Sequence, residues 1–321
     1  MAETIKILIG YDGSECAEAA LDDLARAGLP DEIEVLVATV GEIWKPLMDI
    51  SDLRAAALAS RRMSVTIAQL QHQAEEALKE AEEISGKAVA QIKSDFPKWR
   101  VETEIMSGDA ASAIIQKAAD WDTDLIIVGT QNRSAVGRFF LGSVSRKVVT
   151  EAGCSVRVAR GGGLEKDKDA PPRIIIGVDG SPAAEQAIHA VGTRVWQDGT
   201  EVKLIAVDDR VATPARVSTL LPQAAQMINS YNQTKELRVH SMIEWGTNEL
   251  NVIGLRTASS MEAGDPGRVL IEEARRWSAD AIFVGTRDFN SSFERLRLGS
   301  VSTAVVTNAP CTVEVVRAYA N

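Results

Sequence analysis

Short apolar runs alternate along this chain with longer segments in which apolar residues recur every three or four positions. The runs at 5–11, 35–40, 100–106, 125–128 and 155–159 are short and rich in β-branched residues. Runs of this kind are typical of strands that are buried on both faces of a parallel sheet. The pattern therefore predicts five strands in the first half of the chain.

The segments between these runs have the period of amphipathic helices. Ser14 can act as the N-cap of a first helix. A long helix is predicted over about 52–94, with a stop at Phe96-Pro97, and shorter helices are predicted over 110–119 and from Ser143. Alternating strands and helices predict right-handed βαβ crossovers, and hence a doubly wound α/β sheet.

The second half of the chain repeats the first half in the same order. The matched segments are 7–14 with 174–181, 108–109 with 264–265, 124–130 with 280–286, 141–145 with 298–302, and 154–156 with 311–313. One shared order indicates the duplication of a domain. Strands are expected at 202–207 and 312–316, whereas 210–251, which corresponds to the long helix, lacks a regular pattern and is left unassigned.

A polar linker separates the two copies. Gly161-Gly162-Gly163 and a charged stretch lead into Pro171-Pro172, and such Gly/Pro-rich segments are typical of domain boundaries. We therefore expect domain 1 at 1–162, a linker at 163–172 and domain 2 at 173–321.

Composition narrows the classes of function. The formal charge of −10, from 35 Lys and Arg against 45 Asp and Glu, argues against generic binding to nucleic acid or anionic membranes. No apolar run approaches the roughly 20 residues of a membrane span, and residues 1–6 lack the features of a signal peptide. A cytoplasmic location is expected. Cys16, Cys154 and Cys311 have no C-x-x-C spacing, which favours buried reduced thiols over metal or redox roles.

The strongest candidate for chemistry is the segment from Gly129 to Ser143. It leaves a predicted strand, crosses a loop with Arg133 and Arg138 but no acid, and enters a helix. Glycine allows close approach to the backbone, and a helix N-terminus presents unpaired N–H groups to an anion such as phosphate. An ordinary strand–loop–helix turn explains the same residues equally well, and the residues alone leave both interpretations open.

Two further residues lie at the same predicted edge of the sheet. Asp12 could accept hydrogen bonds from a ribose or adenine, or hold a magnesium ion. Turn and N-cap chemistry of Asp12-Gly13-Ser14 is the alternative. Val40 ends the second strand and could contact a base, although a core valine is the simpler explanation.

Motifs of several enzyme classes are missing from the sequence. It contains no G-x-x-x-x-G-K-[ST], no G-x-G-x-x-G and no G-x-S-x-G. His72, His189 and His240 lie far apart and outside the repeated segments, which argues against a repeated histidine-based mechanism. Catalysis by an evident acid–base pair finds no support in these residues, and no enzymatic activity is expected from them.

Taken in order, the repeated segments resemble the universal stress protein family. The resemblance lies in the strand ending in Asp-Gly-Ser, the Gly-Asp before a helix, the Asp-Leu-Ile-Ile-Val-Gly strand and the Leu-Gly-Ser-Val-Ser turn, together with Ala309-Pro310-Cys311 at the entry to the last strand. The resemblance holds for each of the two repeats and so covers nearly the whole chain. It implies two tandem Rossmann-like domains of the adenine nucleotide alpha hydrolase type, each with a five-stranded parallel sheet flanked by helices.

The resemblance also implies binding of ATP or AMP in some members, with magnesium accompanying ATP. The ATP-binding branch carries G-2x-G-9x-G-[ST], and here Asn132 replaces the middle glycine with the spacing intact. The implied first-domain site consists of Asp12, Gly13, Val40, Gly129, Thr130, Asn132, Arg133, Gly142, Ser143 and Val144. The corresponding second site consists of Asp179, Val207, Gly285, Gly299 and Ser300.

The second site is expected to be weaker. Asp288 takes the place of the middle glycine there, and ten residues instead of nine precede Gly299. A carboxylate about 4 Å from a phosphate charge would repel it by up to about 4 kcal/mol at an effective dielectric near 20. The sequence thus favours nucleotide binding by the first domain as a signalling or structural ligand. The alternative is an interaction module that acts through protein partners without a nucleotide.

The last strands of the two copies are expected to pair with each other. Family members commonly dimerise through this strand, and an unpaired β-branched edge is a liability for a soluble protein. We therefore expect an internal pseudo-dimer of the two domains, and the association of two chains into a homodimer is a further expectation.

Overall fold

The computed structural model describes residues 4–41, 61–130, 141–161, 170–208, 222–286 and 298–317. The first half forms the strands β1 (Lys6–Gly10), β2 (Glu34–Gly41), β3 (Arg100–Ser107), β4 (Leu125–Gly129) and β5 (Ser155–Ala159). These strands are parallel and lie in the order β3-β2-β1-β4-β5. All five predicted strands are confirmed within one or two residues.

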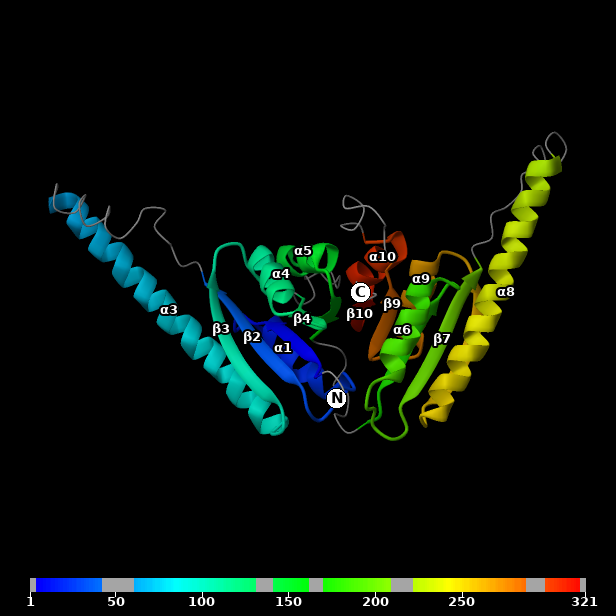
Figure 1. Cartoon of the computed structure of the whole chain (residues 1–321), viewed down its shortest axis with the longest axis horizontal. Coiled ribbons are helices and arrows are strands. Elements are labelled where there is room, and N and C mark those ends of the chain that lie inside the picture. The colour runs from blue at the N-terminus through cyan, green and yellow to red at the C-terminus, as the bar shows by residue number, and fades with distance from the viewer. Residues whose placement is uncertain are drawn as a thin grey trace.

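The second half repeats this sheet. Its strands are β6 (Arg173–Val178), β7 (Glu201–Asp208), β8 (Arg256–Ala263), β9 (Ala281–Gly285) and β10 (Thr312–Val316). Strand β10 pairs antiparallel with β5, which joins the halves into one sheet of ten strands (Figure 1). The predicted pairing of the last strands is thereby confirmed. The bounds of the linker stay a prediction, because residues 162–169 lie outside the described residues.

Helices connect the strands in both halves. They are α1 (Glu15–Asp23), η1 (Leu24–Arg26), α3 (Arg61–Asp95), α4 (Ala110–Asp120), α5 (Ser143–Glu151), α6 (Pro182–Gly192), α8 (Pro222–Val252), α9 (Pro266–Arg276) and α10 (Ser300–Asn308). Ser14 caps α1 and Ser181 caps α6, each by accepting from the backbone N–H of the third residue of its helix. Among the described helices, none combines the length and the apolar character needed to cross a bilayer.

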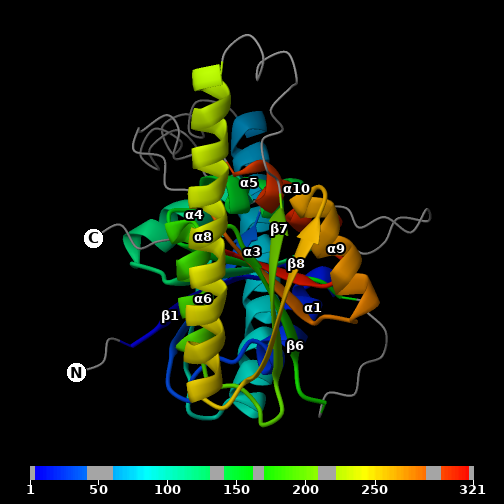
Figure 2. The same cartoon turned by 90° about the vertical axis from the view of Figure 1, so that its right-hand side faces the viewer.

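The long helices show where the sequence pattern was informative and where it was not. Helix α3 confirms most of the predicted 52–94 segment, of which 52–60 lies outside the described residues. Its counterpart α8, left unassigned above, is a helix of 31 residues. The pattern of α8 is hard to interpret because Met227, Tyr231 and Leu237 are apolar but exposed. Both helices extend past the strands at the outer flanks of the molecule (Figures 1 and 2).

The hydrophobic core has one shared layer and two separate ones. On one face of the sheet a single cluster runs through both halves, from Leu8 and Ile114 in the first to Leu270 and Val305 in the second. On the other face, α1 and α3 cover a cluster of the first half, whereas α6 and α8 cover a cluster of the second. The continuous layer buries apolar surface across the junction, so hydrophobic burial as well as strand pairing holds the two domains together.

A charged cluster is buried at the β5–β10 junction. Arg157 of β5 and Glu314 of β10 face each other in the register, and each side chain is 1 % exposed. The Arg157 guanidinium donates to Glu314 at 3.1 Å and to Asp23 of α1 at 2.5 Å. Arg194 completes the cluster through an ion pair with Glu314. Burial alone would lower the pKa of Arg157, but the carboxylates of Asp23 and Glu314 outweigh it and hold that pKa above its ordinary value.

Candidate functional site

Each domain has a pocket at the carboxyl ends of its central strands. In the first domain this is the edge between β1 and β4, where the strand order reverses, which is the usual place for a ligand in an open α/β sheet. The pocket has a volume of about 260 Å³. Its wall comes from the ends of β1, β2 and β4 and from the N-terminal turns of α1, α4 and α5. The sheet topology thus brings together segments that are far apart in the sequence.

The N-terminus of α5 forms one wall of this pocket. Gly142 is the N-cap and no side chain caps the helix, while Ser143, Val144 and Ser145 of the first turn also line the pocket. The first N–H groups of a helix have no partner within it. Gly142 has an ordinary φ of −59°, and a Cβ there would meet no atom of the described residues within 4 Å. Within the described part of the chain, neither backbone conformation nor packing therefore requires glycine at this position, and a glycine adds no side chain at the N-terminus of the helix.

Gly129 has a different reason to be glycine from the one expected. A Cβ at Gly129 would lie 1.9 Å from the backbone oxygen of Cys16, because the first turn of α1 packs directly on the end of β4. The residue lines the pocket, but close packing of two backbones accounts for it without any ligand. Gly285 repeats this contact at 2.0 Å from the backbone oxygen of Ala183.

Asp12 forms the turn that the alternative interpretation expected. Its Oδ1 accepts from the backbone N–H of Ser14 at 3.0 Å, and Gly13 between them has a φ of +73°, where glycine is favoured. The Asp12 side chain is exposed and the residue lines the pocket, so its turn role leaves a carboxylate at the pocket wall. Asp179, Gly180 and Ser181 repeat this turn in the second domain.

The remaining first-domain candidates divide into three groups. Val40 lines the pocket. Thr130 stays outside its wall, because the side chain is buried and its hydroxyl donates to the backbone oxygen of Ala159 at 3.3 Å. Asn132 and Arg133 lie outside the described residues.

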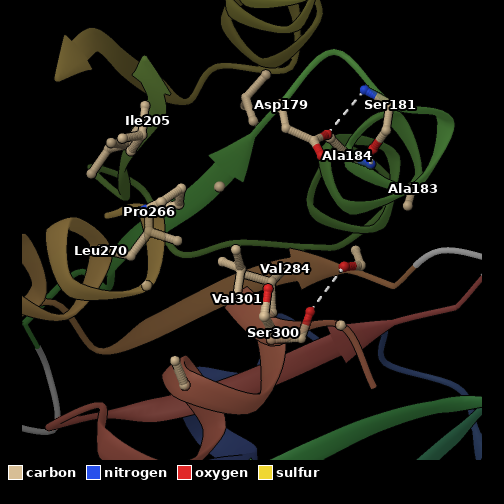
Figure 3. Close-up of a pocket in the computed structure, with 18 of the residues that line it drawn as sticks. Asp179, Ser181, Ala183, Ala184, Ile205, Pro266, Leu270, Val284, Ser300 and Val301 are labelled. Atoms are coloured by element: carbon tan, nitrogen blue, oxygen red, sulfur yellow. Dashed lines mark hydrogen bonds between the residues drawn. The ribbon is translucent and has the colours of Figure 1, made fainter. Parts of the chain in front are cut away.

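The second-domain pocket has the same construction and a larger volume, about 470 Å³. All five of its expected residues line it, namely Asp179, Val207, Gly285, Gly299 and Ser300. Figure 3 shows Asp179 and Ser181 on one side, Ser300 and Val301 on another, and Pro266 and Leu270 on α9. Gly299 has a φ of −61° and, like Gly142, no described atom within 4 Å of where a Cβ would stand.

Sequence reasoning named Val40, Val144 and Val207 but missed most of the apolar part of both walls. In the first domain this part includes Cys16, Ala17, Ala38, Ile114 and Val128. Residues of this kind look like ordinary core positions in a sequence. The repeated Gly-Asp before α4 and α9 could have signalled the wall, since Asp109 and Asp265 are the N-caps of helices whose first turns line the pockets.

The two pockets differ in how the helices beside them are joined. In the first domain, Lys147 of α5 donates to Asp109 at 2.9 Å and to Ser112 at 2.6 Å, which links α5 to the start of α4. In the second domain the contact is apolar, and a Cβ on Gly267 would lie 2.8 Å from the Cβ of Ala304. The ionic link thus occurs in the first domain, and close helix packing takes its place in the second.

This difference predicts a pH-dependent stability effect. Hydrogen bonds from Ser112 and Lys147 hold the pKa of Asp109 below its ordinary value. A lowered pKa in the folded state stabilises the fold above the unfolded pKa of about 3.9, and this stabilisation is lost as pH falls toward the folded pKa. We expect Asp109→Asn to lower the melting temperature at pH 7, and the difference from wild type to shrink below about pH 4.

Asp265→Asn is the matched control. Asp265 caps α9 through Arg268 N–H at 2.8 Å, an interaction that an asparagine oxygen can also accept. We expect this substitution to change the melting temperature less at pH 7. Equal losses for Asp109→Asn and Asp265→Asn at pH 7, or a difference between Asp109→Asn and wild type that does not shrink at all between pH 7 and pH 3, would contradict the role given to Lys147. Melting curves between pH 3 and pH 8 measure both.

Comparison with known proteins places this fold in a family. The model of the universal stress protein family matches residues 4–160 and again residues 172–317. The chain belongs to the universal stress protein family. Because the two matches follow one another, it is a tandem member with two such domains.

Curated relatives agree with this assignment. A universal stress protein of Mycolicibacterium smegmatis is 25 % identical over 316 residues, which is 97 % of this chain and 96 % of that protein. A universal stress protein of Thermus aquaticus is 42 % identical over 86 residues, covering 27 % of this chain and 63 % of that protein. The similarity to the first relative extends over nearly the whole length of both proteins.

Solved structures share the fold. A universal stress protein from Archaeoglobus fulgidus DSM 4304 covers 97 % of this chain and 98 % of its own, with a TM-score of 0.57 and 20 % identity. A functionally unknown protein from Pseudomonas aeruginosa PAO1 covers 98 % of this chain and 93 % of its own, with a TM-score of 0.55 and 14 % identity. Both comparisons extend across the two domains of this chain.

Proposed function

We propose that this universal stress protein binds an adenine nucleotide in its first domain, as a signalling or structural ligand in the cytoplasm. ATP is the expected nucleotide, with AMP as the alternative and magnesium accompanying ATP. In this proposal the nucleotide is bound and at most weakly hydrolysed, since the sequence offers no evident catalytic base. Association of two chains into a homodimer would be compatible with this role.

The observation that carries the proposal is the glycine at the N-terminus of α5. Within the described residues Gly142 is required by neither its φ nor its packing, and the first-turn N–H groups, which have no partner within the helix, lie at the pocket wall. A phosphate accepts hydrogen bonds from such groups and is favoured by the helix dipole. The Ser143 hydroxyl adds a donor. The apolar wall beyond it, with Val40 and Ile114, suits the face of a base.

The choice of the first domain rests on the loops that precede α5 and α10. The loop before Ser143 contains Arg133 and Arg138 and no acid, for a charge of +2, whereas the loop before Ser300 contains three arginines against Asp288 and Glu294, for a charge of +1, and Asp288 takes the place of the middle glycine. Both loops lie outside the described residues, and the described walls of the two pockets are alike. Charge therefore favours the first site, although the second pocket is the larger of the two.

We expect Gly142→Val to weaken ATP binding by the full chain at least tenfold, because its side chain would occupy the approach to the helix N-terminus. A factor of ten corresponds to about 1.4 kcal/mol. Titration calorimetry with ATP and magnesium measures the affinity. Mass spectrometry of the denatured protein identifies any nucleotide that copurifies with it.

Gly299→Val is the matched control, because Gly299 has the same φ region and the same open space at Cβ. This variant should keep the affinity of the wild type. Loss of binding in Gly299→Val alone would move the site to the second domain. If wild type binds no adenine nucleotide and releases none on denaturation, the nucleotide proposal is wrong and the interaction module takes its place.

A further inference from the structure

Arginine side chains cross the junction between the domains and reach the pocket helices at their far ends. Arg317 directly follows β10 of the second domain, and its Nη2 donates to the backbone oxygen of Val149 at 2.6 Å and of Thr150 at 3.3 Å. Both oxygens belong to the last turn of α5, in the first domain. The last carbonyls of a helix lack partners within it, so Arg317 supplies donors and a positive charge where the helix dipole favours them.

Arg160 makes the reciprocal contact. It directly follows β5, and its Nη2 donates to the backbone oxygen of Val306 in the last turn of α10. Burial lowers the pKa of Arg160 to about 10, which still leaves the side chain charged at neutral pH. The two arginines occupy equivalent places in the repeats, and each contacts the helix of the other domain.

The antiparallel register explains why the contacts are exchanged between domains. Val315 pairs with Val156 and Val313 with Val158, so the end of each strand lies beside the beginning of the other. The beginning of β5 follows the end of α5 by a few residues. A residue just after β10 is therefore carried to the C-terminus of α5. The backbone N–H groups of the two arginines also bond to the other domain. That of Arg317 donates to Ser155 Oγ at 3.2 Å, and that of Arg160 donates to Thr312 Oγ1 at 3.4 Å.

Helices α5 and α10 have nine residues each, and their opposite ends line the pockets. At the pocket end of α5, Ser145 Oγ donates to the backbone oxygen of Gly129 at 2.6 Å, within the same domain. Helix α5 is thus held at its N-terminus by its own domain and at its C-terminus by the other. A rigid segment of this length, about 14 Å at 1.5 Å per residue, transmits a displacement from one end to the other.

We infer that Arg317 of the second domain is a positioning residue for the ligand site of the first domain, and that Arg160 serves the second pocket in the same way. Each arginine acts through the helix that it caps and touches no ligand itself. The arrangement makes each pocket depend on the neighbouring domain. Only the identity of the ligand in this inference rests on the proposed function.

The test uses full-length Arg317→Ala and Arg160→Ala variants. Both remove an arginine of the same type from equivalent places at the junction, so a general weakening of the domain pairing would affect them alike. We expect Arg317→Ala to raise the Kd of the first-domain site for ATP about tenfold, and Arg160→Ala to leave it unchanged. Arg317→Lys, which keeps the charge, should recover part of the affinity. Equal losses in the two alanine variants would overturn the inference.

Hydrogen exchange without nucleotide provides a second readout that does not depend on the ligand. Arg317→Ala should speed the exchange of amides in residues 143–151, whereas Arg160→Ala should speed it in residues 300–308. If wild type fails to bind ATP, the proposed function fails, but this crossed pattern still supports the positioning role. Unchanged exchange in 143–151 for both Arg317→Ala and Arg317→Lys would overturn it.

Discussion

Arg157→Met is expected to lower the free energy of unfolding by about 3–5 kcal/mol, the usual cost of leaving a buried charge without its partner. Arg157 lies between Asp23 and Glu314, and its side chain is 1 % exposed. Its removal leaves two carboxylates in a site closed to water, with Arg194 as the remaining cation of this cluster. Denaturant unfolding of the full chain measures the loss.

The double variant Arg157→Met/Glu314→Met should lose less than the sum of the two single variants. Removing the pair leaves Asp23, which accepts from Thr312 Oγ1 at 2.8 Å, and Arg194, which donates to the backbone oxygen of Ala27 at 2.7 Å. Replacing a complete buried ion pair by apolar side chains is often close to neutral. We expect a coupling energy of about 1–3 kcal/mol, the range found for residues in direct contact.

Lys98→Met is the control for this cycle. Lys98 pairs with Asp31 at 2.6 Å, but the two side chains are 64 % and 77 % exposed. Solvent-exposed pairs contribute little, so this variant should unfold at nearly the denaturant concentration of the wild type. Additive losses for Arg157→Met and Glu314→Met would show that the two residues do not act as a pair.

The cluster also bears on which domains can pair. Arg157 and Glu314 are the third residues of β5 and β10 and face each other in the register. Pairing of two first domains in this register would place arginine against arginine, and pairing of two second domains would place glutamate against glutamate. Like charges in a buried site are strongly unfavourable. The charges therefore favour a first domain against a second one.

Gly129→Ala is expected to destabilise the protein by about 3 kcal/mol, at the upper end of the usual cost of overpacking. The new Cβ would lie 1.9 Å from the backbone oxygen of Cys16. A backbone atom cannot rotate away as a side chain can, so α1 must shift from the end of β4. Gly285→Ala should have a similar effect, since its Cβ would lie 2.0 Å from the backbone oxygen of Ala183.

Gly86→Ala is the matched control, because Gly86 is exposed within α3 and a Cβ there would meet nothing within 4 Å. This variant should be more stable than wild type, by up to about 1 kcal/mol, since alanine favours a helix over glycine. Gly142→Ala should also remain folded. Thermal and denaturant unfolding compare the four variants, and a stable Gly129→Ala protein would contradict the packing explanation.

The local pattern determined the elements and their order. Buried strands, amphipathic helices and serine caps are properties of short segments, so the alternation of 5–11, helix and 35–40 was enough to predict a doubly wound sheet. The repeat supported the same prediction a second time, because the second half shows the same strands in the same order. Helix α8 was left unassigned because its apolar residues do not follow a helical period as those of α3 do. Met227 and Tyr231, for example, are apolar but exposed.

Only the tertiary structure decided what individual residues do. Gly129 and Gly142 look alike in the sequence, yet a Cβ on Gly129 would meet the backbone of α1, whereas one on Gly142 would meet none of the described residues. That difference depends on a helix more than a hundred positions away from both glycines. In the sequence, Arg160 and Arg317 look like ordinary charged residues that follow a strand. Their contacts with the opposite helices exist only because β5 and β10 pair antiparallel, and the register of two strands this far apart cannot be derived from either strand alone.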